Sequence, residues 1–424
     1  MSLSDKFETF CTNLKLDDDA MRTSAGNIAK KLNKVYYDLD KDDTSHLYIV
    51  GSVGRKTAID SCSDLDIIFD LPDDIYKKYD NYESNGQSKL LQEVKEYLKQ
   101  LYPKTDISGD GQVVVINFTK YTVEVVPAFK QSDDRFKYPD THDGGSWKYT
   151  NPIPEQEECL DCDNQSKGTY FDFCRLMRAW KNHIGFKFSG ILIDTLVYDH
   201  FLDNNYYKDE DYEKYEDILK SLYTYLSEQN ENQSFWFAVG SNQKIYNSNS
   251  EKFVKKAKKA LKILEENNID EALNLLFGNN YAPDEELECK SKTFEYSNTE
   301  EFIEDFVPID IRYNVKLDCI VSQDGYRDQL LSVILRNHSL LKPNKKLSFS
   351  INNIDSNNYD NIYWKVRNVG PIAEKKDCIR GQILKTNETT HYERTCFRGG
   401  HYVECYLIKN GVCVARGRID VPIE

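Results

Sequence analysis

Two aspartates one residue apart, Asp64 and Asp66, stand inside an otherwise apolar segment, DLDIIFD. Buried carboxylates are costly unless something compensates their charge. Because side chains alternate faces along a strand, both carboxylates would point the same way while their apolar neighbours enter the core. A third acid, Glu124, stands in YTVEVVPAF, on a strand that could lie beside the first.

Three carboxylates converging at one end of a sheet repel one another unless they share a cation. Hard oxygen ligands of this kind select Mg²⁺ or Mn²⁺. We therefore expect two such ions on Asp64, Asp66 and Glu124. There they would clamp the attacking and leaving oxygens of a phosphoryl transfer.

A Gly-Ser turn, Gly51 and Ser52, precedes these aspartates by about a dozen residues. The segment VGRKTAI after it is expected to be a short helix, whose N-terminus and turn N–H groups suit a triphosphate. The Ser52 hydroxyl would donate one more bond. A Gly-Ser turn alone is common, and its combination with Asp-x-Asp and a later acid is far more specific. The alternative, a surface loop with solvated acids, is disfavoured by the apolar flanks.

The elements that must position these residues form a mixed α/β arrangement. Apolar residues spaced three and four apart predict helices over 21–39 and 87–103. Strands are expected around the Gly-Ser turn and the aspartates. Two more, GQVVVINF and YTVEVVPAF, should form an antiparallel hairpin.

The rest of the chain divides in two. Helical periodicity runs from about Gly168 to Phe277, and strands dominate beyond Val307, with an Asn-Gly hairpin signal at 410–411. The acidic segment after Pro283 is the best linker candidate. We predict a first domain over 1–290, with a core over about 1–150 and a helical lobe over about 151–290, and a β-rich domain over 300–424.

The composition and charge of the chain argue against several classes of function. The chain has 55 Lys and Arg against 70 Asp and Glu, a net charge of −15, which argues against sequence-independent duplex binding. No apolar run approaches the length of a membrane span, and the N-terminus lacks a secretory signal pattern. Eleven cysteines without such a signal are typical of reduced thiols. We expect a cytoplasmic protein with no membrane partner.

The segment LYIVGSVGRKTAIDSCSDLDIIFDLP, together with VEVVPAF, resembles the nucleotidyltransferases of the cyclic GMP-AMP synthase type, the bacterial CD-NTases of the SMODS type. GGSWKYTNP, FCRLMRAWKN, FSGILIDTL and LFGNNYAP resemble later segments of that family. The likeness covers about two thirds of the chain. YWKVRNVGPIAEKKDCIRGQI and GGHYVECYLIKNGVCVARG resemble the adenylyl/guanylyl and SMODS C-terminal sensor (AGS-C) domain. The resemblance implies an α/β, polymerase β-like mixed-sheet core with a helical lobe and a β-rich C-terminal domain.

The resemblance also implies roles for individual residues. It assigns the metals to the three acids, although many relatives have aspartate where this chain has Glu124. It implies that the Gly-Ser turn binds the phosphates. It also implies that Lys181 and Ser189 contact the donor triphosphate. A lysine at a helix end is otherwise commonly a solvated residue. Asp194 falls one position later than the familiar acid of relatives, and we assign it no role.

The function implied is a template-independent, metal-dependent nucleotidyltransferase. It would convert nucleoside triphosphates into a short cyclic or linear oligonucleotide signal, in bacterial antiphage defence. The product would activate a separately encoded effector, and a trigger or ligand could act at the C-terminal domain. One alternative is a polymerase of linear chains, including chains of deoxynucleotides. Another is a catalytically silent oligonucleotide-binding module.

Other candidate features favour structural interpretations. The pair Cys159 and Cys162 has the spacing of half a zinc site but lacks a second pair, so we expect two reduced thiols in a loop. The lysine-rich segment 255–262 has an apolar face, so its lysines are expected to be solvated rather than to bind nucleic acid. Arginines and a histidine among the C-terminal strands could grip phosphate or pair with acids, and we assign them no ligand: Arg380, Arg398, His401 and Arg416.

Overall fold

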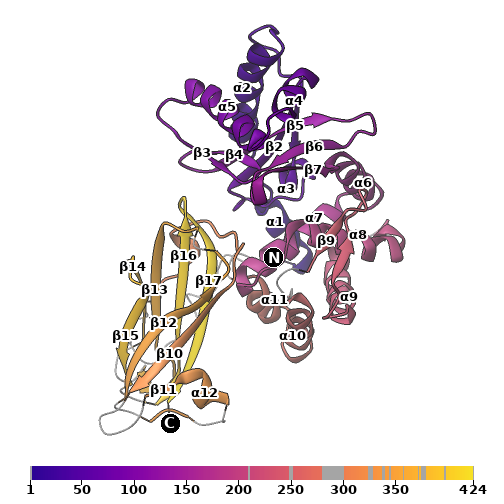
Figure 1. The fold of residues 1–424 in the computed structure, drawn as a ribbon. Coiled ribbons are helices and arrows are strands. Elements are labelled where there is room, and N and C mark those ends of the chain that lie inside the picture. Colours follow the sequence, from indigo (N-terminus) through magenta and orange to yellow (C-terminus); the bar gives the residue numbers. More distant parts are fainter. Residues whose placement is uncertain are drawn as a thin grey trace. The chain divides into compact units, whose positions relative to one another are not determined.

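The computed structural model describes residues 2–208, 211–247, 252–278, 300–322, 328–336, 340–342, 345–356, 358–370, 372–373, 379–395 and 398–423. The chain groups into two compact units, one of Met1–Trp180 with Phe188–Ala282 and one of Lys181–Lys187 with Pro283–Glu424. The linker expected after Pro283 lies almost wholly outside the described residues. Mixed α/β structure followed by β-rich sheets confirms the predicted fold class (Figure 1).

A seven-stranded mixed sheet organises the first unit, in the order β1-β2-β5-β4-β3, with β6 pairing to β5 and β7 to β6. The pairing of β2 with β5 is parallel, and that of β4 with β5 is antiparallel, as the hairpin prediction required. The strand bounds are β1 Leu47–Val50, β2 Asp64–Asp70, β3 Asp106–Asp110, β4 Val113–Asn117, β5 Thr122–Lys130, β6 Phe136–Asp140 and β7 Ser146–Thr150.

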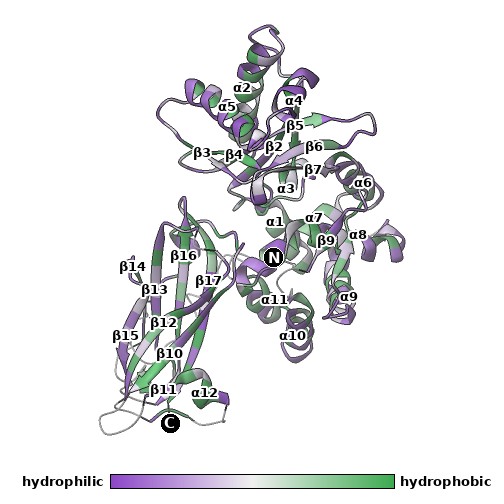
Figure 2. Ribbon diagram, viewed as in Figure 1, coloured by the Kyte–Doolittle hydropathy of each residue, from purple (hydrophilic) through white to green (hydrophobic). Residues whose placement is uncertain are grey.

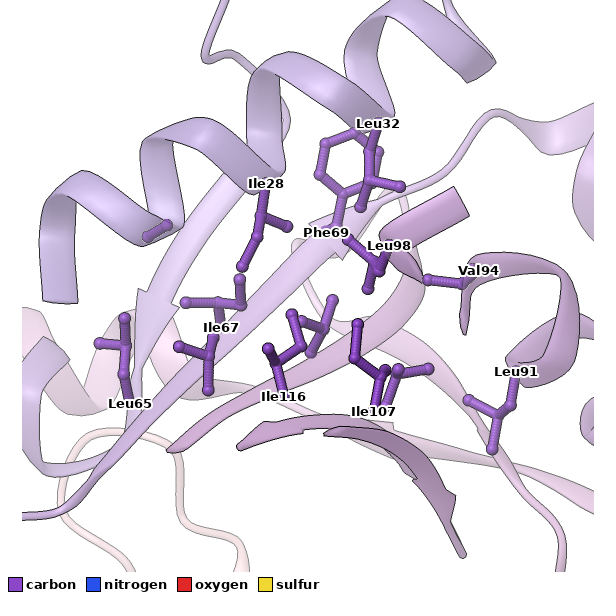
Figure 3. Close-up of a cluster of buried hydrophobic side chains, with 14 of the residues drawn as sticks. Ile28, Leu32, Leu65, Ile67, Phe69, Leu91, Val94, Leu98, Ile107 and Ile116 are labelled. Atoms are coloured by element: carbon purple, nitrogen blue, oxygen red, sulfur yellow. The ribbon is translucent and has the colours of Figure 1, made fainter. Parts of the chain in front are cut away.

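Two helices supply apolar side chains to the core on one face of this sheet, α2 (Asp19–Tyr36) and α5 (Gly86–Leu101). Helix α2 buries Ile28 and Leu32, which lie on one face because they are four residues apart. Leu65, Ile67 and Phe69 of β2 complete the same core (Figure 3). The alternation of β2 therefore turns both aspartates to the opposite face.

Helices make up most of the remainder of the first unit. Their bounds are α1 Leu3–Asn13, α3 Gly51–Gly54, α4 Asp73–Asp80, α6 Pro152–Gln165, α7 Thr169–Ile184, α8 Gly190–Asp203, α9 Tyr215–Glu228, α10 Phe253–Glu266 and α11 Ile269–Phe277; the last turn of α7 groups with the second unit. A short hairpin joins β8 (Phe235–Phe237) to β9 (Lys244–Tyr246). None of the described helices has the length and apolar character that a membrane crossing requires.

Helix α6 corrects one prediction. Cys159 and Cys162 lie on this helix rather than in a loop, and both are buried. The helix starts with Pro152, whose fixed φ suits a first helical position. Its buried stripe includes Glu155 as well as the two thiols, so its sequence lacks a clean apolar periodicity. Burial raises the pKa of Cys159 to about 12, which keeps the thiol protonated.

Two four-stranded antiparallel sheets form the second unit, β11-β10-β12-β15 and β14-β13-β16-β17. Phe349 of β12 and Trp364 of β13 are fully buried in the core that both sheets share. Figure 2 shows hydrophobic and hydrophilic residues alternating along these strands. Asn410 and Gly411 both have positive φ, 49° and 77°, in the predicted hairpin turn between β16 and β17.

The bounds in the second unit are β10 Val315–Ser322, β11 Gln329–Leu330, α12 Leu331–Arg336, β12 Lys346–Ile354, β13 Asn361–Arg367, β14 Arg380–Thr386, β15 Thr390–Arg394, β16 Gly399–Lys409 and β17 Val412–Ile423. Strand β14 begins at Arg380, one of the arginines expected among the C-terminal strands. Its sequence, RGQILKT, buries only Gly381 and Ile383, so its apolar alternation is weak.

Candidate active site

The structure brings the three predicted acids to neighbouring positions on two strands. In the parallel pairing of β2 with β5, Asp66 lies directly opposite Glu124, and Asp64 lies opposite Thr122. The residues between them, Leu65 and Val123, are fully buried. Because the period of a strand is two, all three carboxylates lie on the same face of the sheet.

Thr122 is a contact that the sequence did not reveal. Its hydroxyl donates a hydrogen bond to Asp64 Oδ1 at 2.5 Å, and the Ser63 hydroxyl lies 3.5 Å from the same oxygen. These donors fix the orientation of the Asp64 carboxylate. Its position in the sequence could have indicated this contact, because Thr122 precedes Glu124 by two residues and therefore shares its face of the strand.

Glu124 is the acid whose proton affinity is most changed by this arrangement. Withdrawal from water, with repulsion from Asp66 and then from Asp110, raises the pKa of Glu124 to about 7. A group with such a pKa in a cluster of acids is a candidate functional residue. Without a cation, Glu124 therefore changes its protonation state near neutral pH and is mostly protonated below it.

The ligand set fits a hard divalent cation in its chemistry. Among the described residues, no group of three or more His, Cys, Asp or Glu side chains is placed so that it could hold a metal ion in this arrangement. The raised pKa of Glu124 and the shared face are the observations that favour Mg²⁺ or Mn²⁺, because a cation would relieve the repulsion. Asp64, Asp66 and Glu124 would hold it.

Replacing Glu124 with glutamine is expected to make the metal-free protein more stable at high pH. The unfolded carboxyl ionises near 4.5 and the folded one near 7, so ionisation opposes folding increasingly between these values. The advantage of Glu124→Gln should be small at pH 5 and reach at most about 3 kcal/mol above pH 7. Urea unfolding in EDTA at pH 5 and pH 8 measures it, with the exposed Glu96→Gln as control. If Glu124→Gln raised the free energy of unfolding equally at both pH values, the raised pKa assigned to Glu124 would be contradicted.

Gly51 holds the Gly-Ser turn directly against this cluster. Its φ is +65°, and a Cβ at this position would lie 1.8 Å from Asp66 Oδ2. The turn itself forms the one-turn helix α3, Gly51–Gly54, so the helix expected over VGRKTAI (53–59) begins two residues earlier and ends at Gly54. Ser52 is half-buried, with its hydroxyl 3.9 Å from Cys62 Sγ. The turn therefore lies directly beside Asp66.

Lys181 and Ser189 make other contacts in this structure. Lys181 groups with the second unit, where its buried ammonium donates to the Ile311 carbonyl at 3.0 Å and lies 3.5 Å from Asp310 Oδ1. Ser189 is the N-cap of α8, and its hydroxyl accepts from the Leu192 N–H at 3.3 Å. Contact of either residue with a nucleotide remains a prediction.

Removal of the Lys181 ammonium tests these contacts. We expect Lys181→Met to cost about 1–3 kcal/mol of stability, because it leaves a buried carbonyl without its donor. Thermal unfolding would show this as a lowered Tm, and the exposed Lys259→Met should leave Tm unchanged. An unchanged Tm for Lys181→Met would show that the buried hydrogen bond does not contribute.

Two of the basic residues noted among the C-terminal strands pair with acids, and Arg380 does so with Glu393 at 2.8 and 2.9 Å. Arg380 and His401 line a cavity of about 420 Å³ within the second unit, whose wall also includes apolar residues such as Phe349. Arg416 likewise donates to a carboxylate, that of the buried Glu404, at 2.7 Å. A cavity of this volume and mixed lining is suited to a small organic ligand.

Two family models match the chain. The Second Messenger Oligonucleotide or Dinucleotide Synthetase (SMODS) domain matches residues 1–163, and the Adenylyl/Guanylyl and SMODS C-terminal sensor domain (AGS-C) matches residues 297–424. Together they include the three acids, the Gly-Ser turn and the second unit's sheets.

Individual relatives agree with these matches. A probable cyclic nucleotide synthase of Bacillus cereus (strain VD146) is 23% identical over 185 residues, 37% of this chain and 56% of the relative. A cyclic GMP-AMP synthase of Escherichia albertii is 26% identical over 95 residues, 22% of this chain and 21% of the relative. The chain thus spans about half of one curated relative and a fifth of the other.

A solved structure agrees at the level of fold. Escherichia coli CdnC, in a structure with ATP, is 16% identical and superposes with a TM-score of 0.50, covering 66% of this chain and 98% of its own. The same protein in a complex with HORMA-deltaN gives 15% identity and a TM-score of 0.50, covering 65% and 97%. The chain belongs to the SMODS-type CD-NTases, a family of cyclic dinucleotide and oligonucleotide synthases, and carries a C-terminal AGS-C domain.

Proposed function

We propose that this chain joins nucleoside triphosphates, without a template, into a short cyclic or linear oligonucleotide and releases pyrophosphate. The observation that carries the proposal is the register of Asp66 with Glu124 on parallel strands, with the Gly51 turn packed against Asp66. Family membership supports nucleoside triphosphates as the substrates. These contacts favour a triphosphate-binding turn beside a set of hard oxygen ligands for a metal ion.

Each part of the site has a role in this reaction. Asp64, Asp66 and Glu124 would hold two Mg²⁺ or Mn²⁺ ions, which when bound activate the attacking hydroxyl and stabilise charge at the α-phosphate. Thr122 keeps the Asp64 carboxylate oriented. The turn at Gly51 and Ser52 receives the triphosphate through backbone N–H groups and a hydroxyl.

We infer that the product is a signal in bacterial antiphage defence that activates a separately encoded effector. The supports are the SMODS and AGS-C matches. The cavity lined by Arg380 and His401 is the place where a trigger or ligand of the C-terminal domain would bind. The cytoplasm supplies both triphosphates and Mg²⁺ for this reaction.

Product analysis tests the proposal. The purified protein is incubated with each labelled NTP and dNTP, singly and mixed, with Mg²⁺ or Mn²⁺, and the products are treated with phosphatase and resolved by mass. A phosphatase-resistant product, absent from the Asp64→Asn/Asp66→Asn variant, is expected for a cyclic synthase. A ladder of phosphatase-sensitive chains would assign a linear polymerase. Nucleotide binding without product in any mixture, both in the full chain and in a variant that lacks the C-terminal domain, would contradict synthesis and favour a binding module.

A further inference from the structure

A buried charge cluster connects helices of the first unit to the loop that follows the Gly-Ser turn. Asp194 of α8 is fully buried, and its carboxylate accepts hydrogen bonds from three side chains. Arg55 Nε and Thr57 Oγ1 each donate to Oδ2 at 2.9 Å. Arg178 of α7 donates to Oδ1 at 2.6 Å and to Oδ2 at 2.9 Å.

Opposite charges balance within this cluster. Arg55 also donates to Glu155 of α6 at 3.2 Å, so two guanidinium groups face two carboxylates, all of them buried. Burial alone would raise the pKa of Asp194, but Arg178 and Arg55 together hold it below the ordinary value, so Asp194 is ionised. Burial raises the pKa of Glu155 above its ordinary value. Apolar residues often replace such a cluster without loss of stability, so stability alone does not account for it.

The backbone continues from the cluster to the candidate active site. The Arg55 N–H donates to the Gly51 carbonyl at 3.1 Å. The N–H groups of Thr57 and Ala58 donate to the Ser52 carbonyl at 3.0 and 3.2 Å. Two of the three residues that bind the Asp194 carboxylate through their side chains, Arg55 and Thr57, therefore also bind the turn through their backbone.

We propose that Asp194, Arg55, Thr57 and Arg178 are positioning residues that set the Gly51–Ser52 turn against Asp66. They fix the position of this turn relative to helices α7 and α8. A triphosphate bound at the turn then lies against the acids in a reactive orientation. This inference rests on the proposed function. Displacement of a substrate-positioning group by about 1 Å can reduce the rate of the chemical step by about a hundredfold. Small displacements of this turn should therefore affect catalysis.

Thr57→Val is the sharpest test, because it removes one hydroxyl and no charge. Two readouts are compared in the full chain: kcat and KM for product formation, and amide hydrogen exchange of residues 51–58 without nucleotide. We expect kcat to fall about tenfold or more and the exchange of the turn to accelerate, while Thr57→Ser restores both. Arg55→Lys keeps the charge but changes the geometry, and it should alter both readouts in the same direction.

Thr195→Val is the matched control. Thr195 is also buried and adjoins Asp194, but its hydroxyl accepts from the Val239 N–H at 3.1 Å. We expect it to lower Tm without changing kcat or the exchange of the turn. If both threonine variants had the same effect on the turn and on kcat, or if Thr57→Val had none, the positioning role would be overturned. Hydrogen exchange does not depend on catalysis, so an inactive wild-type protein would contradict the proposed function alone and leave this test in place.

Discussion

Product formation is expected to fall by at least about a thousandfold when Asp64 and Asp66 are both replaced by asparagine. Asparagine has nearly the same shape, and both side chains are only half-buried, so the packing of β2 is retained. The change removes two of three carboxylates that would hold the divalent cations. It also removes the repulsion that Asp66 exerts on Glu124, so the metal-free variant should fold at least as stably as the wild type at pH 8.

A matched control lies on the same strand. Asp70 is also half-buried, and its Oδ1 accepts from the Lys130 N–H at 2.8 Å, a bond that asparagine can keep. Asp70→Asn should therefore retain activity. Initial rates, measured with mass-resolved products, report the loss of catalysis. Titration with Mn²⁺ by calorimetry reports the loss of metal binding separately. A double variant that forms product at the wild-type rate would exclude these carboxylates from the reaction.

The face of the strand on which the acids lie could be predicted because it depends only on local pattern. Alternation within DLDIIFD places Asp64 and Asp66 together whatever the rest of the fold does. The pairing with Glu124 required a neighbour 58 residues later, and the sequence offered it as a possibility that the parallel register of β2 and β5 then supplied.

Contacts made through long sequence separations could not be predicted. Asp194 meets Arg55 across 139 residues, and Lys181 meets Ile311 across 130. No periodicity or spacing encodes such partners, because tertiary packing decides them. Helix α6 was missed for a local reason, since its buried positions include an acid and two cysteines rather than a clean apolar stripe.

Gly51→Ala is expected to reduce product formation by about a hundredfold through the position of the turn. An alanine at φ +65° is strained, and its Cβ would meet Asp66 Oδ2 at 1.8 Å, so either the turn or the carboxylate must move. Gly168→Ala separates the two causes: Gly168 has φ +98°, and a Cβ added there would meet no atom within 4 Å, so it carries the strain without the collision. Both variants should lose some Tm, but only Gly51→Ala should lose kcat. Equal kcat in the two would mean that the turn and Asp66 are not held together during catalysis, and the triphosphate grip would then have to be sought elsewhere on this face of the sheet.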